Sequence, residues 1–245
     1  EARSRRVPPE EDDKVLTAWN GLMLKSLAEA ASILDRGDYL QAAIASATFL
    51  LTEMRRDGRL RRTHRNGETK LNGYLEDYAF LADGLLALYE ATFDRRWLEE
   101  ARSLAGEMID LFYEPYQGAF YDTGKDHEAL VMRPRSIFDN AAPSGGSVAS
   151  GVLLRLATLT GDASYSNMAA TALRSVRELM EKVPTAFGHW LGALDYYLST
   201  PKEIAIIGGK NDPGTQALLR VVHSRYLPNR VIAGLDPKSP AEAEG

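Results

Sequence analysis

The sequence has 245 residues, of which 44% are hydrophobic and 26% charged, and its formal net charge is −5. This composition is typical of a globular protein with enough chain for one large hydrophobic core or two smaller ones. The negative charge argues against partners such as nucleic acid or an anionic membrane. Cysteine is absent, which excludes disulfide bonds, cysteine-based zinc sites and thiol nucleophiles within these residues.

No segment of the sequence resembles a membrane span or a secretion signal. No run approaches the roughly 18 uninterrupted apolar residues of a membrane helix. The N-terminal stretch EARSRRVPPEEDDK is charged and lacks the apolar region of a signal peptide. We therefore expect a cytoplasmic protein with no membrane partner. Residues 1–11, basic and then acidic, are predicted to be a linker that arrives from a preceding part of a longer chain.

Residues 12–200 are predicted to contain three and a half copies of a helical-hairpin repeat. Apolar residues at steps of three or four positions predict helices over 14–34, 38–54, 74–92 and 95–112. A third copy follows in SVASGVLLRLATLTGDASYSNMAATALRSVRELM. A fourth begins with FGHWLGALDYYLS and then stops.

Three glycines, Gly21, Gly84 and Gly151, align the copies at a period of about 60 residues. The turn signals Asp57-Gly58 and Asn66-Gly67 predict a short β-hairpin between two copies, and YQGAFYDTG predicts another. Such units must stack on their neighbours to bury their apolar faces. An open solenoid would do this, but the long helices favour part of an (α/α)6 toroid. The glycine-bearing helices are expected to be the inner ones.

After Pro201 the pattern changes. The strand-like run EIAIIGG, the helical run DPGTQALLRVVHSRY and the strand-like run NRVIAG predict a small βαβ-like appendage over 201–235. Asp212 is expected to cap the helix, with Pro213 at its first position. Residues 236–245 are predicted to be a tail. The predicted fold is thus dominated by α-helices: a partial toroid with short β-hairpins and a small C-terminal appendage.

Each copy of the repeat turns polar where its inner helix is predicted to begin. Asp13 precedes the first of these helices, Glu76 and Asp77 the second, and Asn140 and Ser144 the third, within the run IFDNAAPSGGSVASG. Such residues commonly cap helix N-termini, and this remains the alternative interpretation. If the helix starts converge on one rim, the carboxylates would instead form a sugar site. Glu76 or Asp77 is then expected to remain free after capping. The alternative is that one of these acids caps its helix and the other pairs with Lys14 or a nearby arginine.

Aromatic residues near this rim are candidates for stacking on sugar rings, with core packing as the alternative. They are Tyr74, Tyr78, Trp19, Phe138 and Trp190. His189 is the histidine best placed for proton transfer, and no histidine spacing suggests a metal or cofactor site. The predicted catalytic residues are Glu76, Asp77, Asp13 and His189, and the predicted substrate-binding residues are Trp19, Asn20, Tyr78, Asn140, Ser144 and Trp190.

Four motifs in order, DDKVLTAWNGLM, GYLEDYAFLADGLLALYEAT, AAPSGGSVA and EIAIIG…LLRVVHSRYLPN, resemble the spermatogenesis-associated, thioredoxin-domain-containing family. The resemblance implies an N-terminal thioredoxin-like domain followed by a toroid of the six-hairpin glycosidase kind. It also implies relatives among N-acylglucosamine 2-epimerases and glycoside hydrolases. The present residues would then be the C-terminal portion, with only part of the toroid. Gly146 stands where the family is expected to have asparagine, which argues against a side-chain amide function there.

Two functions follow as hypotheses. The first is a carbohydrate-active domain, similar to a glycoside hydrolase or a sugar epimerase, within a larger thioredoxin-domain protein. The second is a non-catalytic binding or scaffold module that positions the thioredoxin-like portion. The expected partners are a sugar ligand and that missing portion, and a homo-oligomer stays open. If the toroid is incomplete, the apolar faces of the first and last helices should lack their usual neighbours.

Overall fold

The protein is a curved double row of helices, as seen in a computed structural model that describes residues 6–7, 11–209 and 212–236. Most of the predicted linker 1–11 and nearly all of the predicted tail 236–245 lie outside the described residues. The inner helices are α1 (Thr17–Leu34), α3 (Leu75–Thr92), α5 (Gly145–Thr160) and α7 (Gly188–Leu198). The outer helices are α2 (Gly37–Glu53), α4 (Arg95–Phe112) and α6 (Ala163–Lys182).

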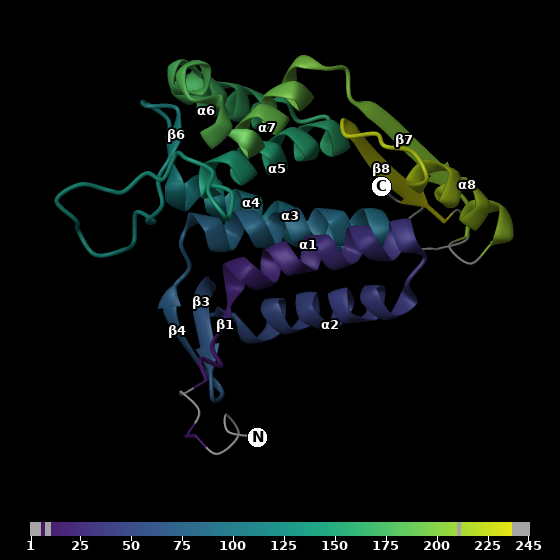
Figure 1. Ribbon diagram of the computed structural model, residues 1–245, viewed down its shortest axis with the longest axis horizontal. Helices are drawn as coiled ribbons and strands as arrows, with labels where there is room; N and C mark the ends of the chain where they lie inside the picture. The colour runs from purple at the N-terminus through teal and green to yellow at the C-terminus, as the bar shows by residue number, and fades with distance from the viewer. Residues whose placement is uncertain (1–5, 8–10, 210–211, 237–245) are drawn as a thin grey trace.

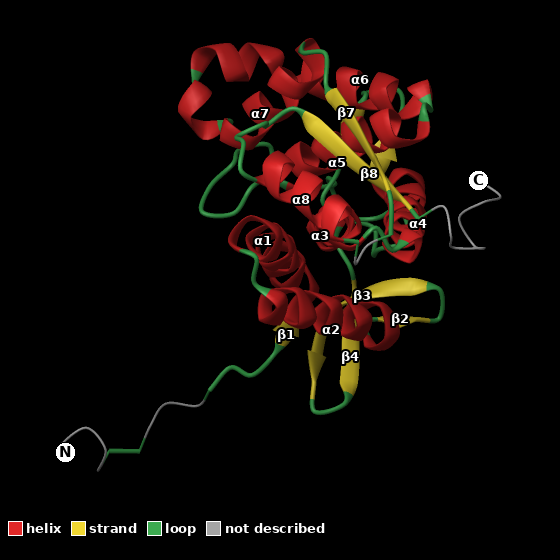
Figure 2. Ribbon diagram, turned by 90° about the vertical axis from the view of Figure 1, so that its right-hand side faces the viewer, coloured by secondary structure: helices red, strands yellow, loops and turns green. Residues whose placement is uncertain are grey.

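The inner helices pack side by side in chain order, and each of the first three also packs on the outer helix that follows it (Figures 1 and 2). The helices that carry Gly21, Gly84 and Gly151 therefore form the inner row, as the repeat alignment predicts. The first two connections from an outer helix back to the next inner helix contain β-strands. These connections therefore gather at the N-terminal ends of the inner helices.

Helix α3 is the centre of the core. Nearly all of its residues are buried, because α1, α4 and α5 surround it, and this explains its almost uniformly apolar sequence. The contact with α1 is close enough to require glycine. A Cβ atom on Gly21 would lie 2.6 Å from the carbonyl carbon of Phe80, and one on Gly84 would lie 2.8 Å from the oxygen of Gly21.

The strands between α2 and α3 form a larger sheet than the predicted hairpin. Strand β3 (Arg59–Arg65) pairs with β2 (Arg55–Arg56), β4 (Glu68–Asn72) and β1 (Val15–Leu16). The predicted turns are present, with Asp57 and Asn66 in left-handed conformations (φ 53° and 52°). Because Val15 and Leu16 pair with this sheet, α1 begins at Thr17 and not at residue 14. A second hairpin joins β5 (Tyr113–Glu114) to β6 (Ala119–Phe120).

The predicted βαβ appendage lies at the C-terminal ends of the inner helices (Figure 1). It consists of β7 (Lys202–Ile207), α8 (Pro213–His223) and β8 (Arg230–Leu235), and its two strands are parallel. The carboxylate of Asp212 accepts a hydrogen bond from the backbone N–H of Thr215 at 3.1 Å, as expected for a helix cap. Two strands cannot form an independent sheet, and β8 packs on α3 and α5.

Candidate active site: a carboxylate-lined cavity

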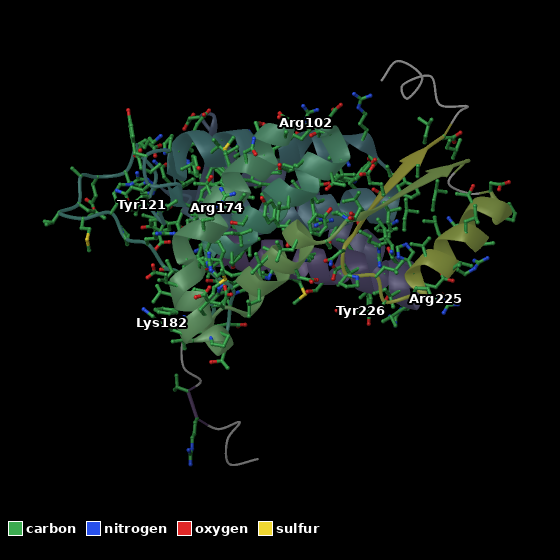
Figure 3. All side chains as sticks on the ribbon, turned by 90° about the horizontal axis from the view of Figure 1, so that it is seen from above. Arg102, Tyr121, Arg174, Lys182, Arg225 and Tyr226 are labelled. Carbon is green, nitrogen blue, oxygen red and sulfur yellow. The ribbon has the colours of Figure 1, made fainter. Side chains whose placement is uncertain are left out.

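A cavity of about 600 Å³ lies between the start of α3 and the long connection 121–144 that leads to α5. The N-terminal ends of the inner helices and the connections between repeats meet here, at the end of the molecule opposite the appendage (Figure 1). Figure 3 labels Tyr121 at the beginning of the connection. The lining side chains include Tyr74, Glu76, Asp122, Ser136, Phe138 and Asn140.

Glu76 is the carboxylate that the second copy of the repeat contributes to the cavity. It lies in the first turn of α3, its side chain is 39% exposed, and its Oε1 atom is 2.8 Å from Nη1 of Arg62 on β3. Tyr74 precedes it and stacks on His127 with ring centroids 5.1 Å apart. The guanidinium of Arg62 lies 4.7 Å from the Tyr74 ring centroid. These contacts hold an aromatic ring beside the carboxylate.

Asp122 is a second carboxylate in the cavity, and it was not predicted from the sequence. Its Oδ2 atom accepts hydrogen bonds from the backbone N–H and the hydroxyl of Ser136, at 2.9 and 2.7 Å. Its backbone oxygen accepts from the N–H of Leu75 at 2.9 Å, which ties the connection to the start of α3. Burial raises the pKa of Asp122 and the charge of Glu76 raises it further, while the hydrogen bonds from Ser136 lower it.

Asp77, in contrast, is fully buried and joins two helices. It accepts hydrogen bonds from the backbone N–H of Ala18 on α1 at 2.9 Å and from that of Tyr74 at 2.8 Å. Arg62 also contacts it, at 3.1 Å. Burial raises its pKa to about 6. Of the two adjacent acids, Asp77 is therefore the cap, and Glu76 faces the cavity while paired with Arg62.

Asp139 joins the starts of α5 and α7 in the way that Asp77 joins those of α1 and α3. One of its oxygens accepts from the backbone N–H of Ser144 and the hydroxyl of Ser147, both at 2.8 Å, and the other accepts from the N–H of His189, also at 2.8 Å. Ser144 caps α5 by accepting from the N–H of Ser147 at 3.2 Å. The run IFDNAAPSGGS is thus both a helix cap and, through Asn140, part of the cavity wall.

Two aromatic candidates belong to the core. Tyr78 has 0% exposure, and its hydroxyl accepts from the backbone N–H of Leu60 at 3.1 Å. Trp190 has 1% exposure, and its indole N–H donates to the oxygen of Ile137 at 2.9 Å. The prediction that these rings stack on a sugar is wrong, because neither ring has a face that a ligand can reach. Phe138 and Tyr74 line the cavity instead.

The residues predicted around α1 lie outside the cavity. Trp19 is 67% exposed on α1, and the Asn20 amide donates to the oxygen of Leu16 at 2.8 Å. Asp13 is exposed and pairs with Arg65 at 2.5 Å. The alignment placed Asp13 at a helix start, but β1 intervenes. Of the three helix starts, only those of α3 and α5 therefore contribute residues to the cavity.

His189 does not line the cavity either. It lies in the first turn of α7, and its ring is not part of the cavity lining. Burial lowers its pKa, while the nearby carboxylates of Asp83 and Asp139 raise it and the charge of Lys25 lowers it. Lys25, Asp83 and Arg155 form an ion-paired group across α1, α3 and α5, with both distances 2.8 Å. His189 therefore lies near this ion-paired group between the inner helices, and not at the cavity.

Among the described residues, no group of three or more histidine, aspartate or glutamate side chains is arranged to hold a metal ion. None of their helices is long and apolar enough to cross a membrane.

Helical hairpins in a curved double row, with a polar cavity at the inner-helix N-termini, form part of a helical toroid. No family model matches the sequence. The α-1,6-mannanase of glycoside hydrolase family 76 from Salegentibacter sp. HEL1_6 has a TM-score of 0.55 at 18% identity, over 66% of this chain and 47% of that one. Another structure of this mannanase is an inactive variant, with two consecutive aspartates replaced by asparagine, in complex with α-1,6-mannotriose. Cellobiose 2-epimerase from Bacillus thermoamylovorans B4167 has a TM-score of 0.52 at 12% identity, over 69% and 46% of the two chains.

The sequence itself is similar to spermatogenesis-associated protein 20. The protein from Rattus norvegicus is 37% identical over 255 residues, which cover 98% of this chain and 32% of that protein. The protein from Homo sapiens is 36% identical over 252 residues, with the same coverage. The resemblance to the spermatogenesis-associated family is therefore confirmed over nearly the whole chain, and the chain spans about a third of the length of these relatives.

Proposed function

We propose that this chain carries a carbohydrate-processing site of the glycoside hydrolase type, with Glu76 and Asp122 as its two reacting carboxyl groups. The observation that carries the proposal is the cavity itself. It brings together two carboxyl groups that no helix cap uses and the rings of Tyr74 and Phe138. Aromatic rings beside paired carboxyl groups suit a sugar, which has apolar ring faces and a hydroxyl-rich edge.

The chemistry of glycoside hydrolysis requires the two carboxyl groups to be in different protonation states. One donates a proton to the glycosidic oxygen as the C–O bond breaks, and the other, ionised, activates water or attacks the anomeric carbon. Asp122 suits the proton donor, because burial and the charge of Glu76 raise its pKa. Glu76, whose Oε1 atom lies 2.8 Å from the guanidinium of Arg62, is the other carboxyl group of the pair.

Sugar epimerisation receives less support from this geometry. Proton abstraction beside a carbonyl group needs a base such as histidine near the substrate. His189 is half-buried and does not line the cavity. His127 is beside the cavity, but its Nδ1 accepts a hydrogen bond from the backbone N–H of Gly124 at 3.0 Å and its ring stacks on Tyr74.

The test is an assay of the full-length protein against manno- and gluco-oligosaccharides, with products identified by mass spectrometry. We expect Asp122→Asn and Glu76→Gln each to lower turnover at least about 100-fold, the usual contribution of a general acid or base. The matched controls Asp110→Asn and Glu178→Gln change exposed acids on α4 and α6 and should retain activity. Retention of turnover by the two cavity variants would refute the site.

The proposal also includes the ligand, the cellular location and the rest of the polypeptide. We infer that a sugar is the ligand and that the chain works in the cytoplasm, joined to a thioredoxin-like portion. The alternative is a non-catalytic module that binds a partner or positions that portion. Binding of an oligosaccharide without any product, in the wild-type protein, would favour this alternative.

A further inference from the structure

Helices α6 and α7 enclose an apolar groove that is open at the surface. Its volume is about 520 Å³, and its floor and walls include Leu173, Met180, Leu191, Leu194, Tyr197 and Leu198. Leu198 is 72% exposed, and Leu191 and Tyr197 are each more than a third exposed. A contiguous apolar surface of this kind usually marks an interaction site.

The groove exists because α7 differs from the other inner helices. Helices α1, α3 and α5 are each followed by an outer helix that covers them, but the chain passes from α7 directly into β7 of the appendage (Figure 1). Within the described part of the chain, the place beside α6 where the next outer helix would lie is therefore empty. The apolar side chains at this place, on the last turns of α7 and along α6, are those that such a helix would bury.

We propose that this groove binds an amphipathic α-helix of the same polypeptide, supplied by residues outside these 245. The lengths support this occupant. The chain spans 32% of its curated relatives and 47% of the mannanase chain with the same fold, so such proteins contain further segments. Helix α7 has 11 residues, so an occupant of about three turns, roughly 16 Å long, would cover it. A groove between two helices is a common receptor for such a helix.

The charges at the rim define the occupant further. Arg174 and Arg177 of α6 border the groove, and Figure 3 labels Arg174. Arg177 pairs with Glu181, whereas Arg174 has no ion pair with any described residue. The bound helix should therefore present apolar residues at helical spacing to the groove, and at least one acidic residue beside them toward Arg174.

Photo-crosslinking of the full-length protein tests this proposal. A benzoylphenylalanine replaces Leu198, and a second variant carries it at Tyr116, which is 100% exposed on the β5–β6 hairpin. We expect the Leu198 probe to crosslink within one polypeptide, to a contiguous amphipathic segment outside these 245 residues, and the Tyr116 probe not to do so. Crosslinks between two copies would assign the groove to a dimer and overturn the proposal. Absence of any crosslink from Leu198 would overturn it as well.

Thiol labelling provides an independent measurement, because these residues contain no cysteine of their own. In the full-length protein, Leu198→Cys should react at least about 10-fold more slowly than Tyr116→Cys, as read by mass spectrometry of the labelled peptides. Equal rates would mean that the groove is open to solvent, and the proposal would fail. Neither measurement depends on the carbohydrate site, since the groove lies between α6 and α7 and the cavity lies beside α3.

Discussion

Asp77 and Asp139 lie at the same end of the inner helices as Glu76 and Asp122, yet the surroundings of the two pairs differ. Asp77 accepts from backbone N–H groups at the starts of α1 and α3, and Asp139 accepts from those at the starts of α5 and α7. Each thus joins two neighbouring inner helices. Glu76 and Asp122 hold no helix terminus with their side chains and line the cavity.

The difference follows from the hydrogen-bond acceptors that buried helix starts require. The first N–H groups of a helix have no partner within the helix, so a buried helix start requires an acceptor from elsewhere. Asp77 and Asp139 meet this requirement for adjacent helices, which fixes the spacing of the inner row. The side chains of Glu76 and Asp122 accept from no helix N–H group; they contact Arg62 and Ser136 instead. Under the proposed function, these two carboxyl groups are the ones left to a ligand.

The largest effect is expected for Asp139→Ala. This change leaves the N–H groups of Ser144 and His189 and the hydroxyl of Ser147 without their acceptor. Hydrogen bonds to a charged group contribute roughly 1.5–3 kcal/mol each, so the unfolding free energy should fall by at least about 4 kcal/mol. Urea denaturation measures this loss. Asp94→Ala, which removes an ordinary cap at α4, should cost only about 1 kcal/mol. Equal losses in both variants would contradict the helix-joining function.

The second largest expected effect is a dependence of the unfolding free energy on pH, caused by the titration of Asp77. Its pKa is raised from 3.8 to about 6 in the folded protein by burial, so the folded state binds this proton more tightly than the unfolded state. The resulting stability is fully present below pH 3.8 and is lost as the pH rises through about 6.

Between pH 4 and pH 7, the unfolding free energy of the wild type relative to Asp77→Asn should therefore fall by about 2 kcal/mol. Asp38→Asn serves as the control. Its partner Arg36 lowers the pKa of Asp38 to about 2, so the wild type relative to this variant should show little change across pH 5–7. A flat profile for the Asp77 pair would mean that the buried carboxylate is not proton-linked to folding.

The inner and outer rows could be predicted from the sequence, because the repeat imposes one apolar period on every copy. The aligned glycines Gly21 and Gly84 mark the same close contact between α1 and α3. The start of α1 could not be predicted in the same way. It depends on the pairing of Val15 with His64, far along the chain, and this pairing moves Asp13 away from the rim.

The cavity was harder to predict than the rows. Glu76, Asn140 and Ser144 follow from the polar starts of the repeats, and all three line it. Asp122 comes from a connection with no periodic pattern, whose path is set by contacts such as that of its backbone oxygen with Leu75. For Trp190, the helical pattern gives a place on the chain but not the direction of the ring, which packing between α5 and α7 decides.

A smaller effect is expected where one side chain serves both as a cap and as part of the cavity wall. Ser144→Ala removes the acceptor for the N–H of Ser147, which should lower the unfolding free energy by about 1 kcal/mol. Ser164→Ala is the matched control, because the Ser164 hydroxyl is exposed near the start of α6 while Asp162 provides the cap. It should change stability by less than about 0.5 kcal/mol. If Ser144→Ala has no larger effect, then Ser144 is available to a ligand.

The smallest effect on folding is expected for Glu76→Gln. Glu76 is 39% exposed and has one ion pair, with Arg62, and Arg62 keeps its contact with the buried Asp77 when Glu76 becomes neutral. A partly exposed pair of this kind contributes roughly 0–1 kcal/mol, so we expect a loss of about 0.5 kcal/mol by urea denaturation at pH 7. Asp77→Asn provides the contrast at the adjacent residue, because its amide nitrogen would face a backbone N–H group that needs an acceptor. If Glu76→Gln destabilises the fold as much as Asp77→Asn does, both acids are structural. The cavity would then contain no carboxylate pair that is free to act on a sugar.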